Sequence, residues 1–166
     1  KVHDVYESYL DKKGIFPWQF VRRVEEGGYK LSQDYVFKQD KQKVHNGEKD
    51  FTTPSGIQDM ISSFYYARTL NFKSAKVGDT FEFKCFMDDE IWPLKVKYLG
   101  DEKISIRKGK FNCMKFAPVV QTGRVFKKQD DLSFWVTKDE NRIPILVKAK
   151  IPVGSVKLHL VEWSGL

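Results

Sequence analysis

The chain has 166 residues, of which 41% are hydrophobic and 31% charged, which is enough for one domain with a core of its own. It contains no run of about eighteen apolar residues, and this excludes a membrane-spanning helix within the sequence. Aromatic residues make up 14% of the chain, and such residues favour half-buried pleated surfaces. We therefore expect a single β-rich domain over residues 1–166.

The net charge of +7 permits an anionic partner, but the distribution of the basic residues argues against nucleic acid. Lysines far outnumber arginines, and acidic residues lie between many of them. Arginine is the side chain that binds phosphates and base edges through two parallel hydrogen bonds. We therefore expect a solvated basic surface and no nucleic-acid partner.

Alternation of apolar and polar residues predicts a hairpin near the start of the chain. Tyr29, Leu31 and Tyr35 fall on one face of the second strand, and a shorter alternating run precedes them. Gly27 and Gly28 separate the two runs, and glycine adopts the positive φ that tight hairpin turns require.

The same alternation predicts a second hairpin and a series of later strands. The second hairpin joins residues 81–85 to residues 92–98 through the acidic turn Asp88–Glu90. The later strands are expected at 104–107, 111–116, 124–126, 132–137, 143–151 and 156–161. Strands that follow one another through short turns predict an antiparallel meander, either a curved sheet or a half-barrel.

One segment has helical spacing instead. Ile57, Met60, Ile61, Phe64 and Tyr65 form a single apolar stripe, which predicts one helix over about residues 54–68 packed on the sheet. We expect Phe64 to be buried there. Residues 53–56 open this helix, and we expect them to cap it. Because helix starts carry unpaired amides, an anion site at the same residues is the alternative.

No pattern in the chain assigns catalysis, a cofactor or a metal, so we expect no catalytic residues and no metal ligands. His3, His45 and His159 are widely spaced, and the acidic turn lacks the alternating oxygen ligands of a calcium loop. The two cysteines, Cys85 and Cys113, have apolar neighbours, and we expect buried, unbonded thiols with no catalytic role.

The aromatic residues suggest where a ligand would bind. A curved sheet with one helix against it is able to enclose an apolar cavity, and six aromatic residues are natural wall residues: Trp18, Phe20, Tyr35, Phe37, Trp92 and Tyr98. The alternative is that these side chains simply fill the core.

Four stretches, residues 20–29, 108–116, 135–144 and 153–157, resemble an exported bacterial family of domains of unknown function, number 3108, of Bacteroides-like organisms. The resemblance covers almost the whole chain. It implies a secreted or periplasmic β-rich protein whose leader has been removed. It also implies that family members have further strands at the N-terminus, so that the chain starts partway through the complete domain. It implies no reaction and no site residues.

From these patterns we expect a non-enzymatic, exported cell-envelope protein that binds an apolar or polymeric ligand, or another envelope component. A structural or assembly module with a filled core is the alternative, and a hydrolase is the third hypothesis. An enclosed pocket would separate the first two, and converging titratable groups would identify the third.

Overall fold

The computed structural model describes residues 2–119, 132–151 and 153–165. Its elements in chain order are β1 (Val5–Leu10), β2 (Pro17–Glu26), β3 (Tyr29–Lys38), the 3-10 turn η1 (Gln39–Lys41), β4 (Lys43–His45), β5 (Asp50–Thr52), α1 (Ser62–Ala67), β6 (Thr80–Met87), β7 (Glu90–Ile106), β8 (Gly109–Pro118), β9 (Leu132–Thr137), β10 (Pro144–Ile151) and β11 (Gly154–His159). The strand expected at residues 124–126 lies outside the described residues.

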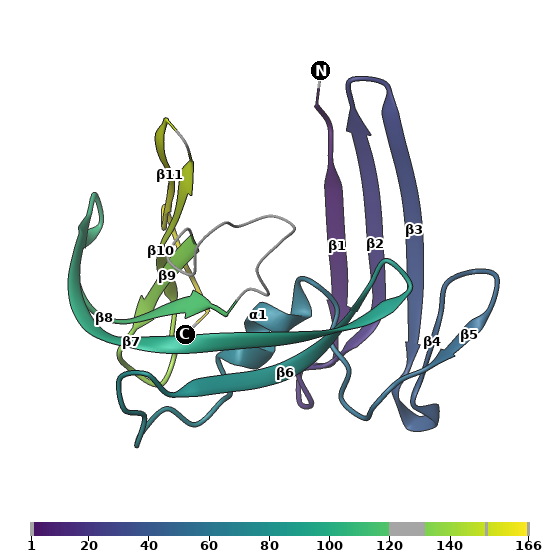
Figure 1. The fold of residues 1–166 in the computed structure, drawn as a ribbon, viewed down its shortest axis with the longest axis horizontal. Helices are drawn as coiled ribbons and strands as arrows, with labels where there is room; N and C mark the ends of the chain where they lie inside the picture. The colour runs from purple at the N-terminus through teal and green to yellow at the C-terminus, as the bar shows by residue number, and fades with distance from the viewer. Residues whose placement is uncertain (1, 120–131, 152, 166) are drawn as a thin grey trace. The chain divides into compact units, whose positions relative to one another are not determined.

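The strands form two antiparallel sheets (Figure 1). The first sheet has the order β1-β2-β3-β4-β5, and the second has the order β11-β10-β9-β8-β7-β6. Neighbours in each sheet are consecutive in the chain, so each sheet is a meander. The mainly β, antiparallel fold is therefore confirmed, with its strands divided between two sheets and with one short helix.

The chain folds into two compact units, which we describe separately. Unit 1 contains residues 1–70 and 83–93, and unit 2 contains residues 71–82 and 94–166. The β6–β7 hairpin contributes its tip to unit 1 and the rest of its length to unit 2. No helix in the described residues is long and apolar enough to cross a membrane.

Unit 1 is built around a tight aromatic core on one face of its sheet. Phe20 on β2 lies directly opposite Tyr35 on β3, and their rings stack with centroids 6.2 Å apart. Phe86, from the tip of β6, packs edge-on against Tyr35 at 5.1 Å. Phe37, Val44 and Ile57 complete the buried cluster. Each of these aromatic side chains is almost wholly removed from water, so the core is filled by hydrophobic burial.

The helix is shorter than the spacing predicts, because it begins only at Ser62, after the buried carboxylate of Asp59. Asp59 Oδ1 accepts hydrogen bonds from the amides of Ile61 and Ser62, both at 2.7 Å, and Ser62 Oγ accepts one from the amide of Asp59. This reciprocal arrangement is typical of helix capping. Upstream, Gln58 forms a β-bridge with Cys85, so residues 57–58 are extended rather than helical.

The prediction that Phe64 is buried is wrong. Its side chain is 64% exposed, and only the N-terminal part of the apolar stripe, with Ile57 buried and Met60 and Ile61 half-buried, meets the core. Ile57, Met60 and Ile61 lie before α1, and within this helix of about 1.7 turns the buried residues are Ser62 and Ser63, which leaves Phe64 facing outward.

β7 is one strand of 17 residues where the sequence pattern predicts two. Its pairing with β8 shifts between Tyr98 and Gly100, so Leu99 is an extra residue in a β-bulge. Gly100 has a φ of 108°, which favours glycine, and allows the strand to continue through the bulge. Figure 1 shows β7 and β8 curving together beyond this point.

Unit 2 has buried clusters on both faces of its sheet. On one face Phe72 contacts Phe81 and Phe116, and Phe116 stacks on Phe134. A second cluster joins Ile104, Cys113, Trp135 and Ile145. Trp135 stands at the border of this second cluster, and the polar residues beside it form the site described next.

Candidate functional site

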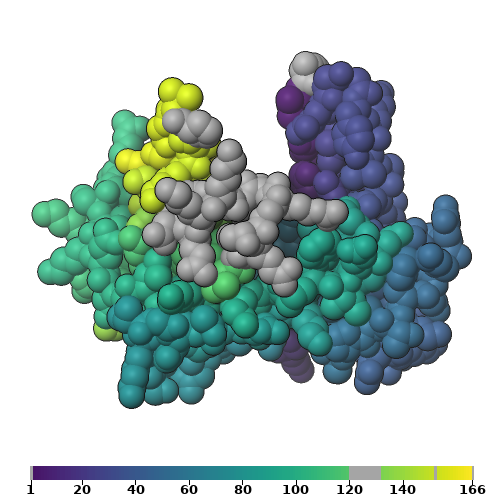
Figure 2. Space-filling model, viewed as in Figure 1, coloured from purple at the N-terminus to yellow at the C-terminus, as the bar shows by residue number. Residues whose placement is uncertain are grey.

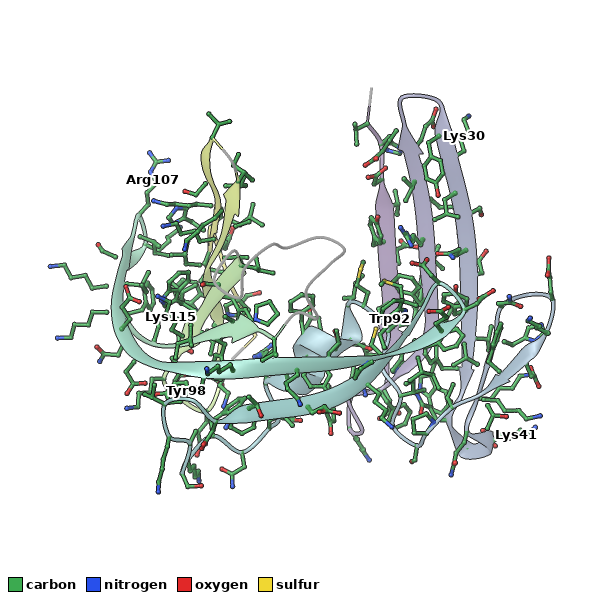
Figure 3. The ribbon with its side chains drawn as sticks, in the orientation of Figure 1. Lys30, Lys41, Trp92, Tyr98, Arg107 and Lys115 are labelled. Atoms are coloured by element: carbon green, nitrogen blue, oxygen red, sulfur yellow. The ribbon has the colours of Figure 1, made fainter. Side chains whose placement is uncertain are left out.

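The six aromatic residues proposed as cavity walls do not form one cavity. The core of unit 1 is filled by Phe20, Tyr35 and Phe37, which agrees with the alternative that these aromatic side chains pack in the core. Trp18 is nearly half exposed. Trp92 and Tyr98 lie on different parts of β7 (Figure 3). The Trp92 indole donates to the carbonyl of Met87 in its own hairpin, so its polar atom has a structural partner.

The cysteines are buried and free, as expected. Burial, with smaller contributions from Asp59 and Asp88, raises the pKa of Cys85 to about 12. Burial raises the pKa of Cys113 to about 11, with Glu102 adding to the effect. A thiol reacts as its thiolate, so neither cysteine is set up as a nucleophile.

The acidic turn between β6 and β7 is a tight hairpin. Asp88 and Asp89 have φ values of 52° and 61°, the pattern of a two-residue type I′ turn. Asp88 binds Arg22 at 3.0 Å, and Asp89 accepts a hydrogen bond from the side-chain amide of Asn46 at 2.9 Å. Both carboxylates therefore fix the turn to unit 1, which is a structural role.

The histidines do not gather into a site. His3 and His159 are exposed, and His45 Nδ1 lies 2.9 Å from an oxygen of Asp50. Lys38 also binds Asp50, and this hydrogen bond lowers the pKa of the carboxyl to about 2. Over the described ranges, no three metal-ligating side chains come together.

The helix start offers no anion site either. Residues 53–56 precede the extended residues 57–58, and α1 begins only at Ser62, so these residues neither cap the helix nor present the amides of a helix start.

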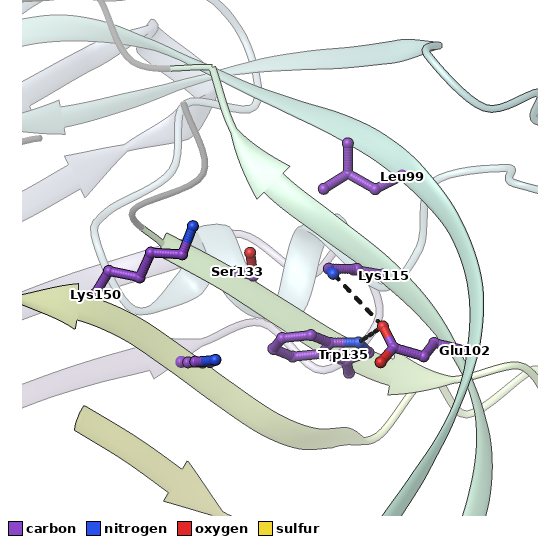
Figure 4. Close-up of a pocket in the computed structure, with 7 residues that line it drawn as sticks. Leu99, Glu102, Lys115, Ser133, Trp135 and Lys150 are labelled. Atoms are coloured by element: carbon purple, nitrogen blue, oxygen red, sulfur yellow. Dashed lines mark hydrogen bonds and ion pairs between the residues drawn. The ribbon is translucent and has the colours of Figure 1, made fainter. Parts of the chain in front are cut away.

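A cavity of about 440 Å³ lies within unit 2, and sequence reasoning did not find it. This volume is within the range that holds a small ligand. Four of the six strands of the second sheet line it (Figure 4). The lining residues are Leu99 and Glu102 on β7, Lys115 on β8, Ser133 and Trp135 on β9, and Lys148 and Lys150 on β10.

The strand register explains why these residues meet. Lys115 and Trp135 are directly opposite each other on β8 and β9, and Ser133 is directly opposite Lys148 on β10. Opposite residues in an antiparallel pair share a face of the sheet. The bulge at Leu99 adds a residue of β7 at the edge of the same hollow.

Trp135 is held in a fixed position within the cavity wall. It is only 5% exposed, and its indole N–H donates to Glu102 Oε2 at 2.9 Å. Lys115 Nζ lies 5.0 Å from the centre of the indole ring and 3.5 Å from the same Glu102 oxygen. Glu102 therefore has two partners in the wall, and the charge of Lys115 is partly neutralised (Figure 4).

The other two lysines of the cavity have no such partner in the part of the chain that the structure describes. Among the described residues, neither Lys148 nor Lys150 lies within 4 Å of a carboxylate. Lys148 is also directly opposite Lys157 on β11, and like charges in that position destabilise a sheet. Within the described ranges, the cavity thus combines apolar wall residues with two lysines that no carboxylate within 4 Å neutralises.

A faint signal for this site is present in the sequence. Lys148 and Lys150 alternate with Val147, Ala149 and Ile151, which shows that the lysines share one face of a strand. The sequence does not show that Trp135 and Lys115 lie beside them, because this depends on the register between strands and on the bulge in β7.

A family model described as a protein of unknown function (DUF3108) matches residues 1–161. No curated protein and no solved structure matches the chain.

Proposed function

The chain belongs to the DUF3108 family, whose function is unknown, and we propose that it is a non-enzymatic cell-envelope protein that binds an anionic amphiphile in the cavity of unit 2. The ligand class we propose is a carboxylate attached to an apolar group. We also propose that the protein is exported, as the family resemblance implies.

One observation carries this proposal: two lysines without acidic partners among the described residues line the same cavity as Trp135 and Leu99. An ammonium group gains most from a carboxylate when nothing else neutralises it. The indole, Leu99 and the lysine stems offer apolar surface to the rest of the ligand, and the Ser133 hydroxyl offers a further hydrogen bond.

Two features favour binding over hydrolysis. Both thiols have raised pKa values, and Glu102, the only carboxylate among the described lining residues, is already hydrogen bonded to Trp135 and beside Lys115. A general base must reach the proton that it removes, and a carboxylate held by two wall residues is poorly placed for this.

Isothermal titration calorimetry with octanoate, 1-octanol and acetate tests the proposal. Octanoate is expected to bind more tightly than 1-octanol, which lacks the charge, and more tightly than acetate, which lacks the apolar chain. Lys148→Gln/Lys150→Gln should weaken octanoate binding about tenfold or more, because a charge-assisted hydrogen bond contributes about 1.5–3 kcal/mol.

The matched control is Lys12→Gln/Lys13→Gln, which removes two charges from an exposed loop of unit 1. If it weakened octanoate binding as much as the cavity variant, the attraction would be one of net charge and the cavity would not be the site. Equal affinity for octanoate and 1-octanol would also contradict the proposal.

A further inference from the structure

The β10–β11 hairpin is a ribbon with two chemically different faces. On one face Val147 lies opposite Leu158, and Ala149 lies opposite Val156. On the other face Lys148 lies opposite Lys157. Side chains alternate between faces along a strand, so one face of the ribbon is aliphatic and the other is basic.

The aliphatic face is uncovered. Leu158 is 65% exposed and Val156 50%, and at the turn Val153 is 93% exposed. Figure 2 shows this hairpin, coloured yellow, at the surface of the molecule. Single exposed aliphatic residues are ordinary, but several on one ribbon face mark a surface that binds something apolar.

The lysines limit what that partner is. β11 is the edge strand of its sheet, so its outer backbone groups are open to pairing with another strand. In the register that places Lys157 directly opposite Lys157 of a second copy, like charges on paired strands disfavour antiparallel pairing of β11. A second copy of the chain is therefore a poor fit.

An anionic lipid surface fits both faces when the hairpin enters it turn first, with Val153 leading. It offers acyl chains to the aliphatic side chains and phosphates to the lysines, whose long stems carry their charge toward the headgroups. We propose that the β10–β11 hairpin binds the surface of an anionic bilayer, with Val153, Val156 and Leu158 at the boundary between headgroups and acyl chains.

This surface is separate from the cavity that carries the proposed function. Val153, Val156, Lys157 and Leu158 do not line the cavity, whereas Lys148 and Lys150 do. Variants at Val153, Val156 and Leu158 therefore test membrane binding without changing a residue of the ligand site or one directly opposite a cavity lysine.

The experiment is sedimentation of the full chain with vesicles of phosphatidylcholine, with or without phosphatidylglycerol. We expect binding only when phosphatidylglycerol is present, and binding that weakens as salt is added. Val156→Thr/Leu158→Thr places β-branched side chains, which suit a strand, at both positions but reduces the apolar surface of β11, and should weaken binding at least about tenfold. Lys157→Gln should weaken it about fivefold.

Matched controls remove similar groups elsewhere. Val36→Thr/Val77→Thr changes two exposed valines outside the hairpin, and Lys12→Gln removes an exposed lysine of unit 1. Both should bind the vesicles like the wild type. Val153→Ser, at a turn residue that pairs with neither strand, should weaken binding even if the β11 variant is poorly folded.

Three results would overturn the proposal. The first is no binding of the wild type to phosphatidylglycerol vesicles, and the second is equal binding by the wild type and the hairpin variants. The third is a dimer without vesicles that Val156→Thr/Leu158→Thr converts to a monomer, because the aliphatic face would then join two copies. Unchanged octanoate binding by Val153→Ser and Val156→Thr/Leu158→Thr keeps this test distinct from the test of the cavity.

Discussion

Units 1 and 2 are both antiparallel, but they treat their polar side chains differently. In unit 1 the buried Asp59 binds two helix amides and also accepts a hydrogen bond of 2.5 Å from Ser8 on β1. In unit 2 Lys148 and Lys150 line an open cavity, and no carboxylate of the described chain lies within 4 Å of either. Polar groups that satisfy one another stabilise a fold, whereas polar groups without partners are available to a ligand.

This comparison predicts large losses of stability from changes in the core of unit 1. Phe86→Ala should lower the free energy of unfolding by about 3–5 kcal/mol, because Phe86 is fully buried against Tyr35 and Phe51. Phe64→Ala, on the exposed side of α1, should change it by less than about 0.5 kcal/mol. Urea unfolding of both variants measures the difference, and similar losses would mean that Phe64 is packed after all.

The Asp59 cap should give the next largest effect. Asp59→Ala leaves the amides of Ile61 and Ser62 without their acceptor, and should cost about 1–3 kcal/mol of unfolding free energy. Asp59→Asn keeps one acceptor oxygen and should cost less. If urea unfolding shows the two variants to be equally destabilised, the hydrogen bonds to the helix amides are not what Asp59 contributes.

The pH dependence of unit 1 follows from the same carboxyl. Burial raises the pKa of Asp59 above its ordinary value of 3.8, so the folded protein favours the protonated form. Protonated Asp59 therefore contributes fully to the free energy of unfolding at pH values below its pKa in the unfolded chain. This contribution is lost as the pH rises through the pKa of Asp59 in the folded protein.

Asp50 has the opposite behaviour, because its pKa is lowered to about 2 and its contribution is lost only as pH falls below about 4. The difference in unfolding free energy between the wild type and Asp59→Asn, followed from about pH 4 upward, therefore isolates the contribution of Asp59. The wild type should lose more stability over this range than Asp59→Asn, and parallel curves would contradict the assignment.

The smallest stability effect is expected in unit 2. Lys148→Gln/Lys150→Gln should leave the unfolding free energy unchanged or raise it by up to about 0.5 kcal/mol, because it relieves the repulsion between Lys148 and Lys157. Thermal unfolding without ligand measures this. A clear loss of stability would show that these lysines hold the sheet together and would weaken the comparison between the units.

The sequence predicts the regular hairpins well. Alternating residues with Gly27 and Gly28 between them predict β2 and β3, and the structure confirms both strands and their turn. It misses β4 and β5, because each has three residues in a polar stretch where alternation has too few members to be recognised. The helix is placed too early because spacing alone does not reveal that Gln58 pairs with β6.

The cavity depends on features that no single strand contains. Trp135 and Lys115 are brought together by the register of β8 and β9, and Leu99 by a bulge at Gly100. The sequence predicts that aromatic side chains line a ligand site, but it points to the core of unit 1, where Phe20 and Tyr35 pack against each other instead. Long-range pairing, rather than local propensity, determines which aromatic residue meets the lysines.

The most direct test follows the indole N–H signals of the protein by NMR while octanoate is added. The Trp135 indole is hydrogen bonded to Glu102 in the cavity wall, whereas Trp18 is exposed in unit 1 and serves as an internal control. We predict a saturable shift of the Trp135 signal with little change at Trp18, and loss of that shift in Lys148→Gln/Lys150→Gln. A Trp135 signal that does not move, or equal shifts of both signals, would contradict ligand binding in unit 2.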